Sequence, residues 1–160
     1  MIPKKWILLA EADPNAADQT LQALADGFAP PAVAVGTDGV DVFDCLYRRG
    51  GLRNRLEGPP AVVLLDVNLP IDGWEVLRRI KSDACLKTIP VVIFASSRNE
   101  DELARSYQLG ASAYVVKPAQ LQQLTATLEA IRAFCIVTNK LPGHAPREGS
   151  SAMAQLATAA

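Results

Sequence analysis

The sequence predicts an α/β domain built on a doubly wound, five-stranded parallel sheet with helices on both faces. Five short apolar runs, rich in Val, Ile and Leu, are mostly continuous rather than alternating, which is typical of strands covered on both faces. A segment with helical spacing follows each run, and this alternation favours parallel strands joined by right-handed crossovers. The runs are WILLA (6–10), AVAV (32–35), AVVLL (61–65), PVVIF (90–94) and AYVV (113–116).

Each segment between or after these runs carries a helical pattern of apolar residues. In the first, residues 15–27, Asp13 and Pro14 supply an N-cap and a first-turn proline. The others cover residues 36–51, 73–83 and 98–110, and one begins near residue 119. The expected inward positions are, in order, Ala17, Leu21, Leu24 and Phe28; Val40, Phe43 and Tyr47; Val76, Leu77 and Ile80; Leu103 and Tyr107; and Leu121, Leu124, Leu128, Ile131 and Cys135.

Composition and charge narrow the function classes. The chain has 160 residues, 49% of them hydrophobic, and a formal net charge of −1, which suits one folded domain and argues against disorder or nucleic-acid binding. No apolar stretch approaches the roughly 20 residues that span a bilayer, so we expect no membrane insertion. Three widely spaced cysteines, without histidines at ligand spacing, are typical of buried residues in a reducing cytoplasm, where we expect the protein to act.

Charged side chains stand where three predicted strands end. Glu11 and Asp13 follow the first run, Asp66 the third and Lys117 the fifth. Sites in such sheets lie at the carboxyl ends of the strands, so these side chains should meet. Clustered carboxylates repel one another unless a cation intervenes, and Mg²⁺ with a few carboxylates, a carbonyl and waters would meet that need. Lys117 could then pair with an anion built on Asp66.

Two motifs, LLDVNLP and GASAYVVKP, together with the order of strands and helices, resemble the receiver domain of two-component response regulators over about residues 5–135. The stretches ARSYQLGASAYVVKP and IRAFCIVTNKLP resemble, more narrowly, single-domain regulators that partner phytochrome-type histidine kinases. The resemblance implies a flavodoxin-like receiver with strand order 2-1-3-4-5. It also implies a histidine kinase as partner and Mg²⁺ as cofactor.

The resemblance assigns roles to individual residues. Asp66 takes the place of the phosphoacceptor, and Lys117 that of the lysine that holds the phosphoryl oxygens. Tyr114 matches an aromatic residue whose rotamer follows the state of the site, although simple core packing is an equal alternative. The bond between Lys117 and Pro118 matches one that is usually cis in the family. The candidate metal ligands are Glu11, Asp13, Asp66 and, through its backbone carbonyl, Asn68.

The first strand end departs from the family pattern. The family has two adjacent acids there, and the second one binds the metal directly. Ala12 occupies that second place, and its methyl group cannot bind Mg²⁺. Asp13 comes one residue late, so it would reach the ion only after a backbone shift; the alternative is that it caps the following helix.

The end of the fourth predicted strand and the loop after Asp66 also depart from the family pattern. Ala95 stands where the family has a Ser or Thr that hydrogen-bonds the phosphoryl group. Ser96 is the candidate replacement, although neighbouring strand residues point to opposite sides, and the serines at 96 and 97 could instead open the next helix. The loop from Asp66 to Gly73 is one residue shorter than usual. Trp74 follows it as either a partner contact or a packing residue.

Three functions remain open from these residues. The first is a regulator that accepts a phosphoryl group on Asp66 from a histidine kinase, and the second is a pseudo-receiver that binds partners without phosphorylation. The third is a phosphohydrolase with Asp66 as nucleophile, but such enzymes need an aspartate where Asn68 stands. A Gly-rich phosphate loop is also missing. We therefore predict a regulator rather than an enzyme.

The last predicted helix runs into the arm FCIVTNKLP, which adds Phe134, Ile136 and Val137 beyond the helix's apolar stripe. A monomer would leave these side chains in water, whereas a two-fold dimer would bury them. We expect a homodimer through this helix and arm, a receiver domain with its arm over residues 1–139, and a flexible tail over residues 140–160. Output is then expected to run through protein contacts.

Overall fold

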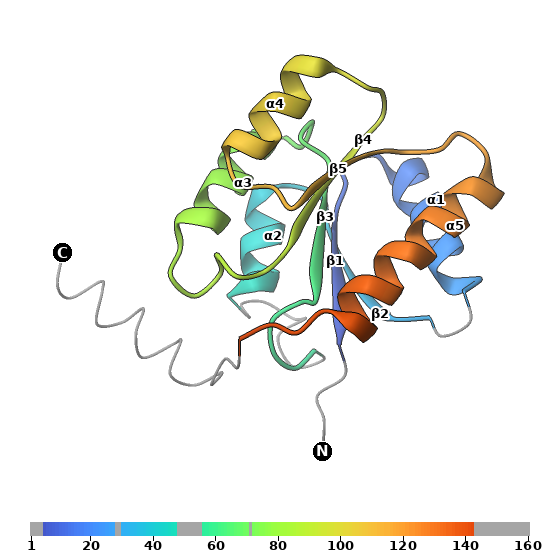
Figure 1. Cartoon of the computed structure of the whole chain (residues 1–160), viewed down its shortest axis with the longest axis horizontal. Helices are drawn as coiled ribbons and strands as arrows, with labels where there is room; N and C mark the ends of the chain where they lie inside the picture. The colour runs from blue at the N-terminus through green and yellow to red at the C-terminus, as the bar shows by residue number, and fades with distance from the viewer. Residues whose placement is uncertain (1–4, 28–29, 48–55, 71, 143–160) are drawn as a thin grey trace, which may run out of the picture.

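The computed structural model describes residues 5–27, 30–47, 56–70 and 72–142. Its centre is a five-stranded parallel sheet with the order β2-β1-β3-β4-β5 (Figure 1), as predicted. The strands are β1 (Trp6–Ala10), β2 (Ala32–Gly36), β3 (Val62–Leu65), β4 (Val91–Ala95) and β5 (Ala113–Val116).

Helices cover both faces of the sheet, with α1 and α5 on one side and α2, α3 and α4 on the other (Figure 1). Their bounds are α1 (Pro14–Ala25), α2 (Gly39–Leu46), α3 (Gly73–Ser82), α4 (Glu100–Gln108) and α5 (Leu121–Arg132). None of the helices in the described part of the chain has the length and hydropathy that a membrane span requires.

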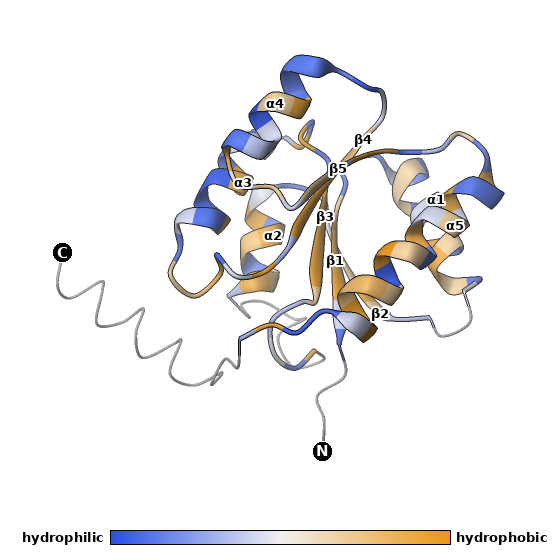
Figure 2. Ribbon diagram, viewed as in Figure 1, coloured by the Kyte–Doolittle hydropathy of each residue, from blue (hydrophilic) through white to orange (hydrophobic). Residues whose placement is uncertain are grey.

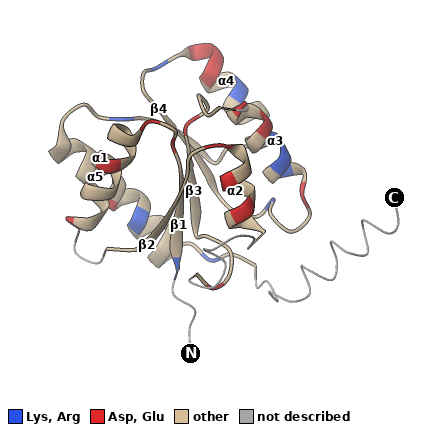
Figure 3. Cartoon of the chain, turned by 180° about the vertical axis from the view of Figure 1, so that it is seen from behind, with Lys and Arg blue, Asp and Glu red and all other residues tan. Residues whose placement is uncertain are grey.

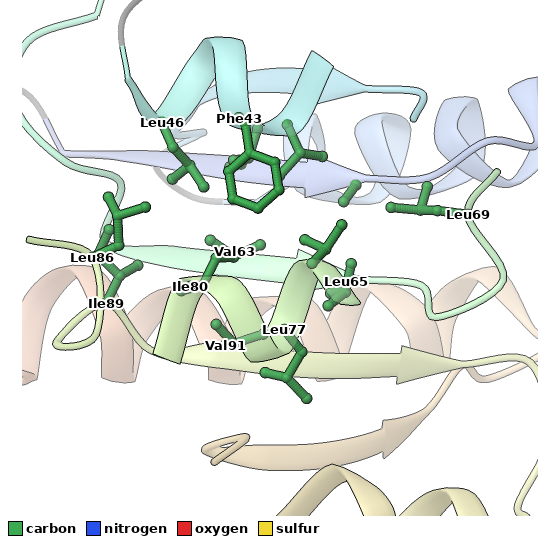
Figure 4. Packing of buried hydrophobic residues seen from close by; sticks show 14 of the residues in the cluster. Phe43, Leu46, Val63, Leu65, Leu69, Leu77, Ile80, Leu86, Ile89 and Val91 are labelled. Atoms are coloured by element: carbon green, nitrogen blue, oxygen red, sulfur yellow. The ribbon is translucent and has the colours of Figure 1, made fainter. Parts of the chain in front are cut away.

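The core forms two layers because alternate strand residues face opposite sides of the sheet. In β1, Leu8 packs among the residues of α2 and α3, whereas Leu9 packs among those of α1 and α5. Apolar residues therefore fill the strands from end to end (Figure 2), and Figure 4 shows Phe43, Leu77 and Ile80 closing over one face. Each fully buried side chain of this size contributes roughly 1.5–3 kcal/mol.

Three expected inward positions are wrong: Val40, Tyr107 and Leu121 are exposed. Asp38 caps α2 through the backbone N–H of Asp41, and in the phase of this helix Phe43 faces the core, as predicted, together with Val42 rather than Val40. In α4 the buried residue is Ser106, so its neighbour Tyr107 points about 100° away from the core. Leu121 is the first residue of α5, and the buried residues of this helix, Leu124 and Leu128, lie further along it. Phe28 lies outside the described residues.

The turn from β3 into α3 is tight. Asp72 has a left-handed φ of 25°, and its carboxylate accepts a hydrogen bond of 3.0 Å from the backbone N–H of Trp74. Gly73 lies directly against Val67, since a Cβ at position 73 would stand 2.5 Å from both the Cα and the carbonyl oxygen of Val67. The start of α3 is thereby packed onto the residue that follows Asp66.

Beyond α5 the chain continues as a π-helix, Ala133–Thr138. The ammonium of Lys5 donates to the backbone carbonyl of Ile136 at 2.7 Å, which ties this segment to the start of β1. Cys135 is buried, whereas Phe134 and Val137 remain 61% and 60% exposed. Of the predicted tail, residues 143–160 lie outside the described residues, so its flexibility remains a prediction.

Gly73→Ala should destabilise the protein by about 3 kcal/mol, because the added methyl group meets backbone that no rotamer change can move. Gly58→Ala is the matched control: Gly58 has φ of 75° but no atom within 4 Å of its would-be Cβ, so only backbone strain of about 1 kcal/mol is expected. Urea unfolding measures both. Equal losses in the two variants would contradict the close packing of Gly73 on Val67.

Candidate functional site

The register of the sheet brings three strand ends together at its carboxyl edge. Ala10 pairs with Leu65, so the next residues, Glu11 and Asp66, come side by side. The backbone N–H of Asp66 donates to the carbonyl of Ala10 at 3.0 Å. On the other side of β3, the backbone N–H of Lys117 donates to the carbonyl of Ala95 at 2.7 Å, which fixes where the lysine leaves the sheet.

Glu11, Asp66 and Lys117 form one charged cluster, which we call the acceptor cluster. The Lys117 ammonium makes an ion pair with Oε1 of Glu11 and a second one, 3.3 Å long, with Oδ2 of Asp66. Glu11 is 5% exposed and Asp66 8%, and the side chain of Lys117 is 17% exposed. One ammonium thus lies between two buried carboxylates.

The lysine reaches this position without the expected cis bond before Pro118. Among the described residues no peptide bond is cis, so that expectation is wrong. Even with a trans bond, the four methylene groups of Lys117 let its ammonium reach the carboxylates at two neighbouring strand ends.

Within the acceptor cluster, burial has its largest effect on the pKa of Glu11. Loss of solvent raises the pKa of Glu11 above its ordinary value; Lys117 opposes this shift, and the negative charge of Asp66 adds to it. A raised pKa means that the Glu11 carboxylate is less stable here than in water despite its ion pair. Clusters in which burial and charge oppose one another in this way are typical of functional sites.

Asp13 does not join the cluster. Its carboxylate caps α1 by accepting a 3.0 Å hydrogen bond from the backbone N–H of Asn15, and its side chain is exposed. The predicted alternative, an N-cap, is therefore confirmed, and service as a metal ligand would require Asp13 to leave the cap. Ala12 packs part of its surface against the core and offers no ligand atom.

The backbone after Asp66 turns back onto its carboxylate. The N–H of Asn68 donates to Oδ1 of Asp66 at 2.8 Å, so both oxygens of the carboxylate are engaged, one by Asn68 and one by Lys117. The side chain of Asn68 itself is exposed.

A divalent cation would find few protein ligands here. In the described part of the chain no three Asp, Glu, His or Cys side chains are grouped so as to hold a metal ion. Two carboxylates, Glu11 and Asp66, remain, together with the backbone carbonyl of Asn68. Since Mg²⁺ usually keeps several waters, this set fits a weak site, in which the ion would compete with Lys117 for both carboxylates.

The residues predicted to take part in switching, Ser96 and Tyr114, differ in their exposure and in their contacts. Ala95 is buried at the end of β4, and Ser96 is exposed. The hydroxyl oxygen of Tyr114 lies 3.0 Å from the carbonyl oxygen of Ser97 and 3.2 Å from Oε2 of Glu102, so its single hydrogen is shared between these two acceptors. Burial raises the pKa of this hydroxyl. Tyr114 is therefore tied to the segment that leads into α4.

The interpretation that the serines open the next helix is wrong. Asn99 is the N-cap of α4, and its side chain accepts hydrogen bonds from the backbone N–H groups of Asp101 and Glu102. Asn can satisfy two free amides at a helix start with one oxygen, so no serine is needed there. The role of Ser96 as a switch residue stays a prediction.

One contact near the site was missed entirely from the sequence. The guanidinium of Arg105 lies over the ring of Trp74, with its carbon 4.6 Å from the ring centroid. Trp74 is half-buried and packs against the core, which confirms its packing interpretation. No local spacing pairs these two residues, because they lie in different helices.

Comparison with known proteins identifies the family. The family model described as "Response regulator receiver domain" matches residues 7–129. The chain is 34% identical over 141 residues to the response regulator Rcp1 of Synechocystis sp., covering 88% of this chain and 95% of that protein.

Solved structures agree with this match. The phosphorylated cyanobacterial phytochrome response regulator RcpA is 38% identical with a TM-score of 0.76, over 88% of this chain and 99% of that chain. The bacteriophytochrome response regulator RtBRR is 40% identical with a TM-score of 0.69, over 98% and 95%. The Mn²⁺-bound form of Rcp1 has a TM-score of 0.73 at 34% identity, over 87% and 99%. The chain belongs to the response regulator receiver domain family.

Proposed function

We propose that this chain accepts a phosphoryl group on Asp66 from a histidine kinase of the phytochrome type and signals through protein–protein contacts. One observation carries the proposal: a buried carboxylate at the edge of the sheet lies 3.3 Å from the Lys117 ammonium. An anion formed on Asp66 would meet a positive charge already in place, and preorganised charge of this kind stabilises phosphoryl transfer.

The transfer of the phosphoryl group forms one bond to phosphorus and breaks one. An oxygen of the Asp66 carboxylate forms a bond to phosphorus while the bond from phosphorus to the imidazole nitrogen of a phosphohistidine breaks. The released imidazole nitrogen takes up a proton from water. Lys117 would turn from Glu11 toward the new phosphoryl oxygens, and a bound Mg²⁺ would supply further positive charge against those oxygens.

The names of the similar proteins support the choice of partner. RcpA is a phytochrome response regulator and RtBRR a bacteriophytochrome response regulator, and this chain covers nearly the whole length of each. A kinase partner of that class also fits the prediction of a cytoplasmic location and of output without nucleic-acid contact. The predicted absence of an enzyme activity belongs to the same proposal.

A second candidate function is a pseudo-receiver that binds partners without phosphorylation. Two observations favour it: Ala95 offers no hydroxyl to a phosphoryl group, and Lys117 already has a partner in Glu11. A phosphoryl group shifts a conformational equilibrium only through contacts that differ between the two states. The loss of one charged hydrogen bond removes about 1.5–3 kcal/mol, as much as a typical coupling free energy.

Incubation with phosphoramidate and Mg²⁺ should place one phosphoryl group on the wild-type chain and none on Asp66→Asn, as read by intact-mass spectrometry. Lys117→Ala should react on the order of 100-fold more slowly, because it loses the charge that meets the developing anion. Labelling of Asp66→Asn would exclude Asp66 as acceptor. A wild-type chain that stays unlabelled, also with a phytochrome-type kinase, would favour the pseudo-receiver.

Ala12→Asp should lower the Kd for Mn²⁺ by about tenfold or more in calorimetric titration, because it adds a third carboxylate beside Glu11 and Asp66. Ala12→Asn, of similar size but uncharged, is the matched control. Asp13→Ser keeps an N-capping oxygen but removes the carboxylate, and it should leave the Kd unchanged. Weaker binding in Asp13→Ser would show that Asp13 is a ligand after all.

We further propose a homodimer through α5 and the π-helix that continues it. Phe134 and Val137 are apolar and more than half exposed, whereas Cys135 between them is buried. A two-fold contact would bury both exposed side chains on each protomer, and each of them contributes roughly 1.5–3 kcal/mol when it leaves water.

Light scattering should find a dimer at micromolar concentration for the wild-type chain and a folded monomer for the double variant F134S/V137S. Tyr107→Ser is the control, because Tyr107 is similarly exposed but lies on α4. It should remain dimeric. A monomeric wild-type chain, or a dimeric double variant, would refute this interface.

A further inference from the structure

Helix α4 buries few side chains, and its main side-chain contacts lie near its two ends. Of its residues Glu100–Gln108, all described, only Ser106 is buried, and none is a buried member of either core cluster. By contrast, α3 buries Gly73, Val76, Leu77 and Ile80. A helix with so little buried apolar surface has low local stability, so a few peripheral contacts can decide its position.

Side-chain contacts hold both ends of α4. In its first turn, which carries the acids Glu100, Asp101 and Glu102 (Figure 3), Glu102 accepts the hydroxyl hydrogen of Tyr114. In its last turn, Arg105 stacks on Trp74, 4.6 Å from the ring centroid. The second contact joins α4 to α3 rather than to β5.

Trp74 is connected to the phosphoacceptor by a short and tightly packed path. It comes directly after Gly73, and Gly73 lies against the backbone of Val67, which is the residue after Asp66. The carboxylate of Asp66 accepts from the N–H of Asn68 in the same turn. A phosphoryl group on Asp66 would compete for that hydrogen bond and so displace the turn. Gly73 would follow, because it is packed directly against Val67 in this turn.

The route through the end of β4 is weakened, because Ala95 has no hydroxyl that could follow a phosphoryl group. We propose that the contact between Trp74 and Arg105 couples the loop of Asp66 to α4, so that these two residues position α4 in response to the acceptor. The proposal rests on the function proposed above. Trp74 and Arg105 are positioning residues, since we propose that they act through the turn after Asp66 and not on the acceptor itself.

The test is hydrogen exchange of the amides of residues 100–108 in the full chain, with and without phosphoramidate and Mg²⁺. Phosphorylation should change the exchange rates of the wild-type α4 by about fivefold or more. Arg105→Gln and Trp74→Leu should lose most of this response. Arg98→Gln is the matched control: it removes the same charge from an exposed ion pair with Glu100, and its response should stay as in the wild type.

The change in exchange rate between the unphosphorylated and the phosphorylated chain distinguishes coupling through Arg105 from a simple stabilisation of α4. If Arg105 only stabilises α4, Arg105→Gln speeds exchange equally in both states and the response persists, which overturns the coupling. A phosphorylated wild-type chain without any response in α4 overturns it as well. Intact mass measured on the same samples reports phosphorylation directly, so failure of the proposed function is recognised separately as an unlabelled Asp66.

Discussion

The position of the Lys117 ammonium between Glu11 and Asp66 is the interaction on which the site depends. Two buried carboxylates at neighbouring strand ends repel each other unless a cation lies between them. The register of the four strands β1, β3, β4 and β5 sets this arrangement, because each side chain leaves the sheet directly after its strand ends. The fold thus places the buried carboxylate of Asp66 beside the ammonium of Lys117.

Two departures from the family pattern, Ala12 and Ala95, are each expected to have a physical consequence for this cluster. With Ala12 where the family has an acid, we expect less negative charge at the proposed cation site, where Lys117 already pairs with both Glu11 and Asp66. With Ala95 at the end of β4, we expect the proposed signal from Asp66 to travel on the side of the loop that carries Gly73 and Trp74. We therefore expect this chain to differ from the family pattern both in how strongly phosphorylation depends on a cation and in the path by which a signal leaves Asp66.

Periodicity and strand ends made most of the fold and the centre of the site predictable from the sequence. Continuous apolar runs identified the five strands, and the rule that sites lie at their carboxyl ends brought Glu11, Asp66 and Lys117 together. Phe43 of α2 is buried as predicted, but Val40 was predicted wrongly, because Val40 and Val42 are both apolar and only the capped start of the helix decides which of them faces inward. The stacking of Arg105 on Trp74 was not predictable, since tertiary contacts between helices leave no spacing in the sequence.

A crystal structure of the chain grown with Mg²⁺ and beryllofluoride, a mimic of the phosphoryl group, tests the roles of Asp66 and Lys117 most directly. We predict beryllium bound to an oxygen of Asp66, with the Lys117 ammonium moved from Glu11 to the fluorines. Beryllofluoride attached elsewhere, or a Lys117 that keeps its contact with Glu11 while the mimic occupies Asp66, would contradict these roles.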